Sequence, residues 1–180
     1  PTSPYGCAKV FAYNIAKNYR QSFDMFITNG ILFNHESPRR GSNFVTSKII
    51  KGACAIKAGK KDSLALGNLD ATRDWGHAKD YVEAMWMMLQ ADYPDDYCCA
   101  TGISHSVRDV CEYVFSKLGM DYKDYVTIDS RYFRPEELHD LKGDATKIKL
   151  ELGWEPTCSF ESLLDDMLNE EMKNENNTNW

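Results

Sequence analysis

An amphipathic segment that leads directly into an apolar segment is the feature that most restricts how this chain can fold. Within residues 5–19, small and apolar side chains recur at helical spacing, so we expect a helix that buries this stripe. The stripe consists of Ala8, Phe11, Ala12, Ile15, Ala16 and Tyr19. Residues 24–33 are mostly apolar, which is typical of a strand buried on both faces of a parallel sheet. Because a helix followed by such a strand is half of a β-α-β unit, the sequence predicts an α/β fold.

The polar loop after this strand is the expected position of a ligand site. Residues 34–42 contain Gly and Pro, and they leave the C-terminal end of the strand, where open α/β sheets bind their ligands. From Arg39 to Lys61 the chain carries seven basic residues and no acidic ones. We expect the last lysines of this stretch to be a solvated helix face. Arg39, Arg40 and Lys48 lie beside the start of a helix, where cations and free backbone N–H groups can bind a diphosphate.

The remainder of the chain alternates between predicted helices and short strands. The predicted helices cover residues 44–57, 78–90, 107–118 and 145–152, and a last one begins at residue 160. The predicted strands cover residues 64–66, 96–100 and 126–128. Two of the helices have apolar faces that we expect to point inward, Tyr81, Val82, Met85, Met88 and Leu89 in one and Leu163, Leu164, Met167 and Leu168 in the other. Ser106 and Asp109 have the spacing of a capping box.

Composition indicates a globular chain and argues against several classes of protein. With 180 residues, of which 43% are hydrophobic, the chain can bury a core. Its net charge of −6 argues against a general nucleic-acid binder, and no apolar run is long enough to cross a bilayer. The six cysteines show no C-x-x-C spacing, so we interpret them as reduced thiols of a cytoplasmic protein, with a disulfide framework as the alternative.

Tyr5 and Lys9 form the most suggestive catalytic pair. Four residues are about one helical turn, so both side chains share a face of the predicted helix. The lysine cation favours the phenolate form, which a tyrosine that acts as general acid/base at neutral pH requires. Two other pairs share this spacing, Tyr13 with Lys17 and Tyr113 with Lys117, so spacing alone is equally compatible with a half-exposed helix face. Tyr5 differs from them because Ser3-Pro4 begins the helix, so that Tyr5 lies at the exposed N-terminal end of the helix.

Five further segments carry a specific resemblance. They are Asn29-Gly-Ile-Leu-Phe-Asn-His-Glu-Ser-Pro-Arg-Arg-Gly41, Phe44-Val-Thr-Ser-Lys-Ile49, Leu66-Gly-Asn-Leu-Asp70, Arg73-Asp-Trp-Gly-His-Ala-Lys-Asp-Tyr81 and Arg131-Tyr-Phe-Arg-Pro135. Together with the Tyr5 and Lys9 pair, they resemble the GDP-mannose 4,6-dehydratase family of extended short-chain dehydrogenases/reductases. The similarity runs from Pro1 to about Met167. It implies an α/β fold, the C-terminal part of an extended Rossmann-type short-chain dehydrogenase fold, with a smaller α/β substrate-binding lobe.

The resemblance also implies a reaction and a set of roles. The reaction is that of a lyase, a hydro-lyase that converts GDP-mannose to GDP-4-keto-6-deoxymannose and water with internal hydride transfer through NADP, the first step toward GDP-fucose and other GDP-deoxysugars. Tyr5 would remove the proton of the C4 hydroxyl, and Lys9 would hold the nicotinamide ribose of NADP. The other implied residues are His35 and Arg40 on the cofactor, and Asn34, Lys48, Arg73, Arg134 and Glu137 on the GDP-sugar. A cytoplasmic homo-oligomer, dimer or tetramer, is implied as well.

Each implied contact has a physical reason and an ordinary alternative. Lys48 and Arg73 can neutralise a diphosphate, or they can form surface ion pairs. Glu137 can accept hydrogen bonds from ribose hydroxyls, or it can be an exposed carboxylate at a helix start. His35 can bind the cofactor or be solvated. The other histidines show no metal-ligand spacing with nearby acids or cysteines, so we predict no metal site.

The sequence predicts an incomplete cofactor domain. No Gly-rich turn that could cradle a pyrophosphate follows any predicted strand, and the chain begins with neither Met nor a signal peptide. We assign residues 1–34 to the end of an NADP-binding Rossmann domain, 35–172 mainly to the substrate lobe with interleaved Rossmann elements, and 173–180 to a disordered tail. We therefore expect a C-terminal fragment that is inactive alone. Because residues 25–33 would lack their neighbouring strands, we also expect them to expose a hydrophobic edge that makes the chain poorly soluble. The alternatives are a non-catalytic module that binds a sugar nucleotide or pairs with subunits, and another sugar-nucleotide dehydratase or epimerase.

Overall fold

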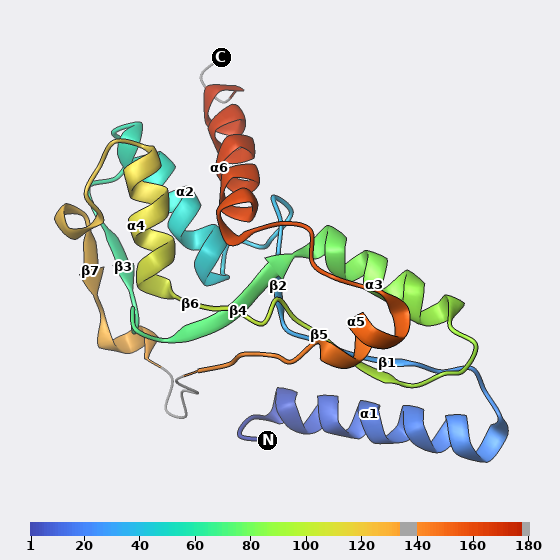
Figure 1. Cartoon of the computed structure of the whole chain (residues 1–180). Coiled ribbons are helices and arrows are strands. Elements are labelled where there is room, and N and C mark those ends of the chain that lie inside the picture. Colours follow the sequence, from blue (N-terminus) through green and yellow to red (C-terminus); the bar gives the residue numbers. More distant parts are fainter. Residues whose placement is uncertain (134–139, 178–180) are drawn as a thin grey trace.

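Three small sheets form the framework of the chain in a computed structural model that describes residues 1–133 and 140–177 (Figure 1). The strands are β1 (Asn29–Leu32), β2 (Asn34–Glu36), β3 (Leu64–Leu66), β4 (Thr72–His77), β5 (Asp96–Cys99), β6 (Ser104–Ser106) and β7 (Val126–Ile128). β1 pairs in parallel with β5, β2 with β4, and β3 with β7, whereas β6 pairs antiparallel with β4. Parallel strands joined through helices are the arrangement that an α/β fold requires.

Six helices connect and cover these strands. They are α1 (Pro4–Phe23), α2 (Val45–Lys57), α3 (Ala78–Gln90), α4 (Val107–Lys117), α5 (Thr146–Leu152) and α6 (Phe160–Asn177), with short 3₁₀ turns at Tyr122–Asp124 and Ser130–Tyr132. All six lie where the sequence predicts a helix. The predicted capping box of α4 is confirmed, since Ser106 Oγ accepts from Asp109 N at 3.0 Å and an Asp109 carboxylate oxygen accepts from Ser106 N at 2.7 Å. Gly153 ends α5 with a φ of 72°, a conformation that favours glycine.

The buried side chains form two clusters, one in each half of the molecule. The larger cluster joins α2, α4 and α6, with Ile49, Val110 and Leu164 fully buried. The smaller cluster joins α3, β5 and α5 around Tyr81 and Trp154. In Figure 1 the first group of helices lies at the left and top, α1 and α3 lie at the right, and β4 runs between the two groups. The cavity described below lies beside β4.

The strand β4 is an element that the sequence does not predict. Its segment, Arg73-Asp-Trp-Gly-His77, is too polar to be recognised as a buried strand. Asp74 explains how so polar a strand is buried. Its carboxylate, fully buried, accepts hydrogen bonds from Thr101 N, Thr101 Oγ1, Gly102 N and Gly143 N at 2.7–3.2 Å. A buried carboxylate is tolerated where its oxygens are satisfied in this way.

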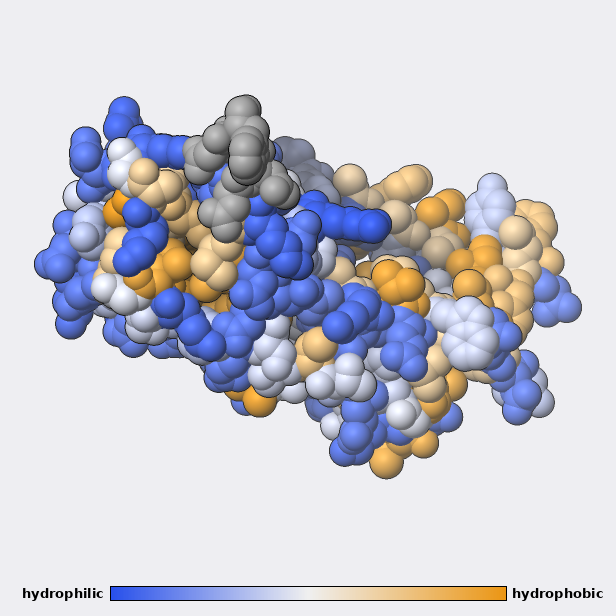
Figure 2. All heavy atoms as spheres, turned by 90° about the horizontal axis from the view of Figure 1, so that it is seen from above, coloured by the Kyte–Doolittle hydropathy of each residue, from blue (hydrophilic) through white to orange (hydrophobic). Residues whose placement is uncertain are grey.

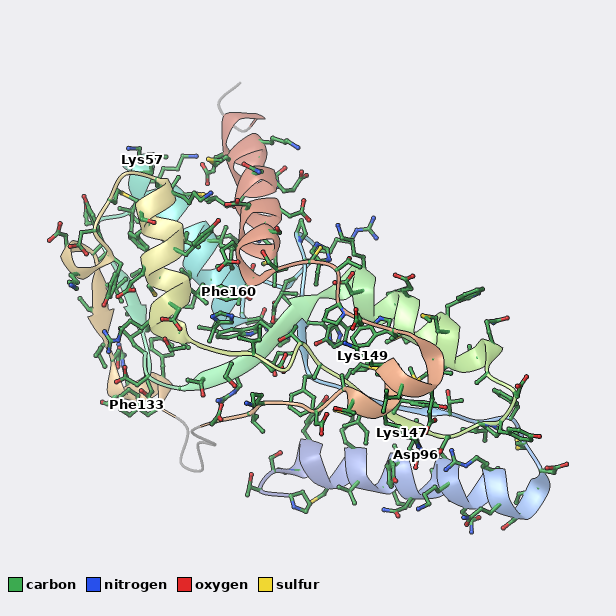
Figure 3. All side chains as sticks on the ribbon, in the orientation of Figure 1. Lys57, Asp96, Phe133, Lys147, Lys149 and Phe160 are labelled. Atoms are coloured by element: carbon green, nitrogen blue, oxygen red, sulfur yellow. The ribbon has the colours of Figure 1, made fainter. Side chains whose placement is uncertain are left out.

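The apolar stripe of α1 is exposed, so the prediction that it is buried is wrong. No residue of α1 is buried, and Phe11 and Ile15 are 68% and 41% exposed. The physical reason is that β1 and β5 form a sheet of only two strands among the described residues, which leaves too little surface to cover a long helix. Polar contacts hold α1 in place instead, because Arg20 and Tyr13 donate to the carboxylate of Asp96 at 2.9 and 2.7 Å (Figure 3).

The predicted strand over residues 24–33 is shorter and more exposed than expected. Its ordered part is β1, which pairs with β5 alone within the described ranges. Met25, Phe26 and Ile31 are 46–49% exposed, so burial on both faces is not observed, whereas the exposed hydrophobic edge expected for residues 25–33 is. A strand with a neighbour on one side only leaves one edge and part of its surface uncovered.

The inward face of α3 is narrower than predicted. Tyr81 and Met88 are buried as expected, but Val82, Met85 and Leu89 are 40–61% exposed, so their predicted inward orientation is wrong. The reason is that α3 rests on a narrow support made by β1, β2, β4 and β5. Figure 2 shows that apolar surface gathers at the right of the view, over the half of the molecule that contains α1 and α3.

The C-terminal helix confirms one prediction and corrects another. Leu163, Leu164, Met167 and Leu168 are all buried as expected. The helix continues through Asn177, so residues 173–177 are helical where the sequence predicts the start of a disordered tail. An ion pair between Lys60 and Glu175 holds this last part of α6 near the end of α2. Residues 178–180 lie outside the described part of the chain. No helix within it is long and apolar enough to cross a membrane.

Candidate functional site

A cavity of about 320 Å³ lies where β2 and β4 meet the start of α2. Three cationic side chains line it, Arg40, Lys48 and Arg73. Three amide side chains line it as well, Asn34, Asn43 and Asn68. Phe44, Trp75 and Tyr132 supply aromatic wall. Cations, amides and aromatic rings around one hollow can hold an anionic ligand that also has a flat, partly apolar portion.

Arg40 is held at the cavity by two neighbours. Its Nε lies 3.0 Å from Glu36 Oε2, and the centre of its guanidinium lies 3.4 Å from the centroid of the Phe44 ring. The contact with Glu36 is an ion pair rather than a well-directed hydrogen bond, because the Nε–H group has no hydrogen-bond acceptor. Burial raises the pKa of Glu36, while a hydrogen bond from Thr46 and the charge of Arg40 act in the opposite direction. The buried carboxylate therefore fixes the position of the cation.

Lys48 and Arg73 line the cavity from two different elements, α2 and β4. Lys48 lies in the first turn of α2, donates from Nζ to the Ala65 carbonyl at 2.7 Å, and lies 3.8 Å from the centroid of the Tyr132 ring. Arg73 lies on β4 and donates to the Thr72 carbonyl at 2.6 Å. Both side chains are cationic and belong to the lining of the cavity.

The Tyr5 and Lys9 pair lies on α1, among exposed residues and apart from the cavity lining. Lys9 Nζ is 5.9 Å from the Tyr5 ring centroid, and Tyr5 is 72% exposed. The same stacking occurs in the two pairs of equal spacing, at 5.8 Å for Tyr13 with Lys17 and 5.0 Å for Tyr113 with Lys117. Those two pairs make structural contacts, to Asp96 in one case and to Asp165 in the other. Only the first pair presents its phenol on an exposed surface without such a contact among the described residues.

His35 is fixed beside the cavity but is not part of its lining. Its Nδ1 lies 2.8 Å from the Phe33 carbonyl oxygen, so that nitrogen carries the proton, and its ring stacks on Tyr81 at 5.0 Å. Of the sequence-predicted residues, the structure therefore brings together Asn34, Arg40, Lys48 and Arg73. Arg40, predicted for the cofactor, lines the cavity together with residues predicted for the GDP-sugar. Arg134 and Glu137 lie outside the described residues.

The family of the chain follows from sequence comparison. A family model described as GDP-mannose 4,6 dehydratase matches residues 1–167. The chain belongs to the GDP-mannose 4,6-dehydratase family. Its similarity to GDP-mannose 4,6 dehydratase 2 of Arabidopsis thaliana is 53% identity over 173 residues, which covers 96% of this chain and 46% of the relative. For GDP-mannose 4,6 dehydratase of Homo sapiens it is 47% identity over 190 residues, with 96% and 51% covered. The chain spans about half the length of the curated relatives it matches.

Solved structures confirm the predicted fold class. RMD from Pseudomonas aeruginosa, complexed with NADPH, superposes with a TM-score of 0.88 at 19% identity over 97% of this chain and 58% of that one. A dTDP-glucose 4,6-dehydratase from Bacillus anthracis in complex with NAD gives a TM-score of 0.83 at 24% identity, over 98% and 54%. At these identities the similarity establishes the fold alone. The extended Rossmann-type α/β fold predicted from the GDP-mannose 4,6-dehydratase resemblance is confirmed.

Several residues of the cavity were not predicted from the sequence. Glu36 and Phe44 position Arg40, Tyr132 covers Lys48, and Trp75 lies at the wall beside Arg73. Glu36 could have been found, because an acid four residues before a base is a recognisable ion-pair spacing. Tyr132 and Trp75 carry no such local signal, since only folding brings them to the cavity. Among the described residues, no group of three or more His, Cys, Asp or Glu could hold a metal ion.

Proposed function

We propose that this chain supplies the sugar-nucleotide-binding part of a GDP-mannose 4,6-dehydratase. The reaction is the conversion of GDP-mannose to GDP-4-keto-6-deoxymannose and water, catalysed by a hydro-lyase as the first step toward GDP-fucose and other GDP-deoxysugars. The proposal rests on the family and on one structural observation: Arg40, Lys48 and Arg73 surround one cavity with Asn34. Three cations around a hollow of this size suit the diphosphate of a nucleotide sugar.

The residues of the chain also suit one end of NADP. The exposed phenol and ammonium of Tyr5 and Lys9, one helical turn apart, are the donor set for a nicotinamide ribose. His35 offers a ring whose proton is already committed to the Phe33 carbonyl, which leaves Nε2 as an acceptor for a hydroxyl or amide donor. Bound NADP would supply reversible hydride transfer. The pyrophosphate of a dinucleotide would need a Gly-rich turn, which does not follow a strand in this sequence.

Tyr5 and Lys9 would divide the proton chemistry between them. Tyr5 Oη would remove the proton of the C4 hydroxyl as the hydride leaves C4, so that a ketone forms there. Lys9 would stabilise the phenolate by its charge and hydrogen-bond the ribose. The ketone would acidify the C5 proton, water would then be lost across C5 and C6, and the hydride taken from C4 would return to C6 to give the 6-deoxy product. The cationic cavity would hold the diphosphate throughout, so that the sugar remains oriented.

The assembly and location of the protein belong to the same proposal. The exposed apolar faces of α1 and α3 are compatible with a homo-oligomer, a dimer or a tetramer. The absence of a membrane-spanning helix among the described residues is compatible with a cytoplasmic enzyme. The net charge of −6 supports a small-molecule ligand over nucleic acid.

Calorimetric titration tests the proposed function. The chain is titrated with GDP-mannose, with UDP-glucose as the control ligand, and is assayed for dehydration with added NADP. We expect binding of GDP-mannose at least about tenfold tighter than that of UDP-glucose, since a difference of 1.4 kcal/mol corresponds to a factor of ten. We expect no turnover by the chain alone. A folded sample that binds neither ligand, or prefers UDP-glucose, would refute the proposal.

A further inference from the structure

Asp96 joins the start of β5 to the helix that carries the exposed tyrosine–lysine pair. Its carboxylate accepts hydrogen bonds from Tyr13 Oη at 2.7 Å, from an Arg20 guanidinium nitrogen at 2.9 Å and from Asn29 Nδ2 at 2.9 Å. Tyr13 and Arg20 belong to α1, and Asn29 is the first residue of β1. One carboxylate, here called the Asp96 joint together with these three partners, therefore links α1 to both strands of the sheet (Figure 3).

The Asp96 joint is shielded from water, and apolar burial does not compete with it. The side chains of Arg20 and Asp96 are only 13% and 15% exposed. Burial raises the pKa of Asp96, but the hydrogen bonds from its three partners outweigh this effect and hold the pKa below its ordinary value. No residue of α1 is buried, so no apolar contact in the core sets the orientation of the helix. The joint therefore decides which side of α1 meets the sheet.

The rotation of α1 about its axis determines where Lys9 lies. Lys9 precedes Tyr13 by four residues, and Tyr13 precedes Arg20 by seven, so the three side chains share one face of the helix. The Asp96 joint turns this face toward the sheet. A slip of one residue would rotate the helix by about 100° and carry Lys9 away from that side.

The position of the joint along the sheet determines how far the first turns of α1 reach. In Figure 1, α1 runs in the opposite direction to β1 and β5, and the joint lies at the first residue of each strand. Tyr5 precedes Tyr13 by eight residues, which is about 12 Å of helix. Tyr5 therefore lies toward the C-terminal ends of the two strands, from which the chain continues to Asn34 and His35. Open α/β sheets bind their ligands at this end.

We propose that Asp96 is a positioning residue for Tyr5 and Lys9, because its carboxylate fixes both the rotation and the reach of α1. The inference rests on the proposed function, in which this pair carries the proton chemistry. Asp96 acts through the helix and touches neither substrate nor cofactor. The neighbouring Asp95 provides a contrast, since its carboxylate pairs with Lys147 rather than with α1.

A nitroxide label on Cys7 tests the proposal. Cys7 is an exposed thiol in the first turns of α1, and the partly exposed Cys98 and Cys158 are replaced by Ala so that one site reacts. Paramagnetic relaxation of the backbone amides then reports where these turns lie in the folded chain. In Asp96→Asn we expect the relaxation enhancements at β1 and β5 to decrease and new ones to appear elsewhere, because α1 is free to rotate and slide.

Two further variants make the result specific. Asp95→Asn removes the same charge from the adjacent residue and should leave the enhancements unchanged. Tyr13→Phe removes one bond to Asp96 and should reproduce part of the change, so it serves as the test variant if Asp96→Asn does not fold.

The label separates positioning from stability. A carboxylate that only stabilised the fold would lower the urea midpoint of Asp96→Asn without moving the label in the folded chain. Unchanged enhancements in whichever of Asp96→Asn and Tyr13→Phe folds, or an equal change in Asp95→Asn, would overturn this inference. The measurement contains no ligand, so that outcome would leave the proposed function to its own calorimetric test.

Discussion

Arg40 Nε lies 3.0 Å from Glu36 Oε2. Glu36 is buried, with 2% of its surface exposed, and Arg40 lines the cavity. Glu36 is the last residue of β2, and Arg40 follows four residues later in the loop that leads to α2. Thr46 Oγ1 donates to the same carboxylate oxygen at 2.8 Å and ties the pair to the first turn of α2. The carboxylate thus joins the loop, the helix and the cavity cation, so the geometry of the site depends on a residue that a ligand need not touch.

The variant Glu36→Gln should weaken both the fold and the site. Loss of the negative charge leaves Arg40 without its counter-charge, and we expect a loss of about 1–3 kcal/mol in the free energy of unfolding, measured from urea denaturation. GDP affinity should fall severalfold, because Arg40 is no longer held over the Phe44 ring. Asp62→Asn, in an exposed turn, is the control for a lost carboxylate and should change neither quantity. Unchanged GDP affinity in a folded Glu36→Gln sample would show that the pair is structural only.

The two ends of α2 provide a matched pair of lysines. Lys48 lines the cavity, whereas Lys57 lies in the last turn of α2, is exposed and is not among the residues that line the cavity. Lys48→Ala should lower the affinity for GDP about tenfold, since a charge-assisted bond to phosphate is lost. Lys57→Ala removes the same charge and should leave the affinity unchanged. Calorimetry measures both, and equal losses in the two variants would mean that the lysines act only through long-range charge.

The apolar face of α1 should drive self-association of this chain. Ile15 is 41% exposed on a helix with no buried residue, and an uncovered apolar face favours contact with another apolar surface. Ile15→Glu should shift the chain toward monomer in sedimentation velocity. Gln21→Glu adds the same charge on the same helix, about 80° away from the edge of the apolar stripe, and should have little effect. Identical sedimentation of the two variants would show that α1 takes no part in association.

The buried thiols should make the fold sensitive to alkaline pH. Burial raises the pKa of Cys99 and Cys111 from 9.0 to about 12 each. Because the folded-state pKa lies above the unfolded value, the stabilisation is complete below pH 9 and is lost as the pH rises from 9 toward 12. Each thiol can contribute up to about 1.4 kcal/mol per pH unit in that window.

Urea midpoints at pH 8 and pH 10 measure this effect. The decrease between the two pH values should be smaller in Cys111→Ala than in the unmodified chain. Cys7 is exposed, so Cys7→Ala should leave the decrease as it was. A decrease of the same size in Cys111→Ala would assign the alkaline sensitivity to other groups.

The sequence by itself determined the elements whose signals are local. The capping box of Ser106 and Asp109, the stop at Gly153 and the inward stripe of α6 depend on residues one or two turns apart, and all three are confirmed. The family was likewise recognisable from the sequence, because short motifs are identified by their residue types alone. The cluster of cations after the first strand, Arg39, Arg40 and Lys48, indicated where a diphosphate could bind. Arg40 and Lys48 line one cavity with Asn34, whereas Arg39 is not among the residues that line it.

Only the tertiary structure decided which apolar faces are covered and which side chains meet. Periodicity shows that α1 and α3 have apolar stripes, but burial depends on a partner surface, and the described residues supply only two strands beside α1. In the same way, the sequence did not predict β4, because its segment is polar. The hydrogen-bond donors that allow Asp74 to be buried there, Thr101 and Gly143, are distant in sequence. Trp75 received its position at the cavity, and its unpaired N–H group, from packing between segments that are distant in sequence.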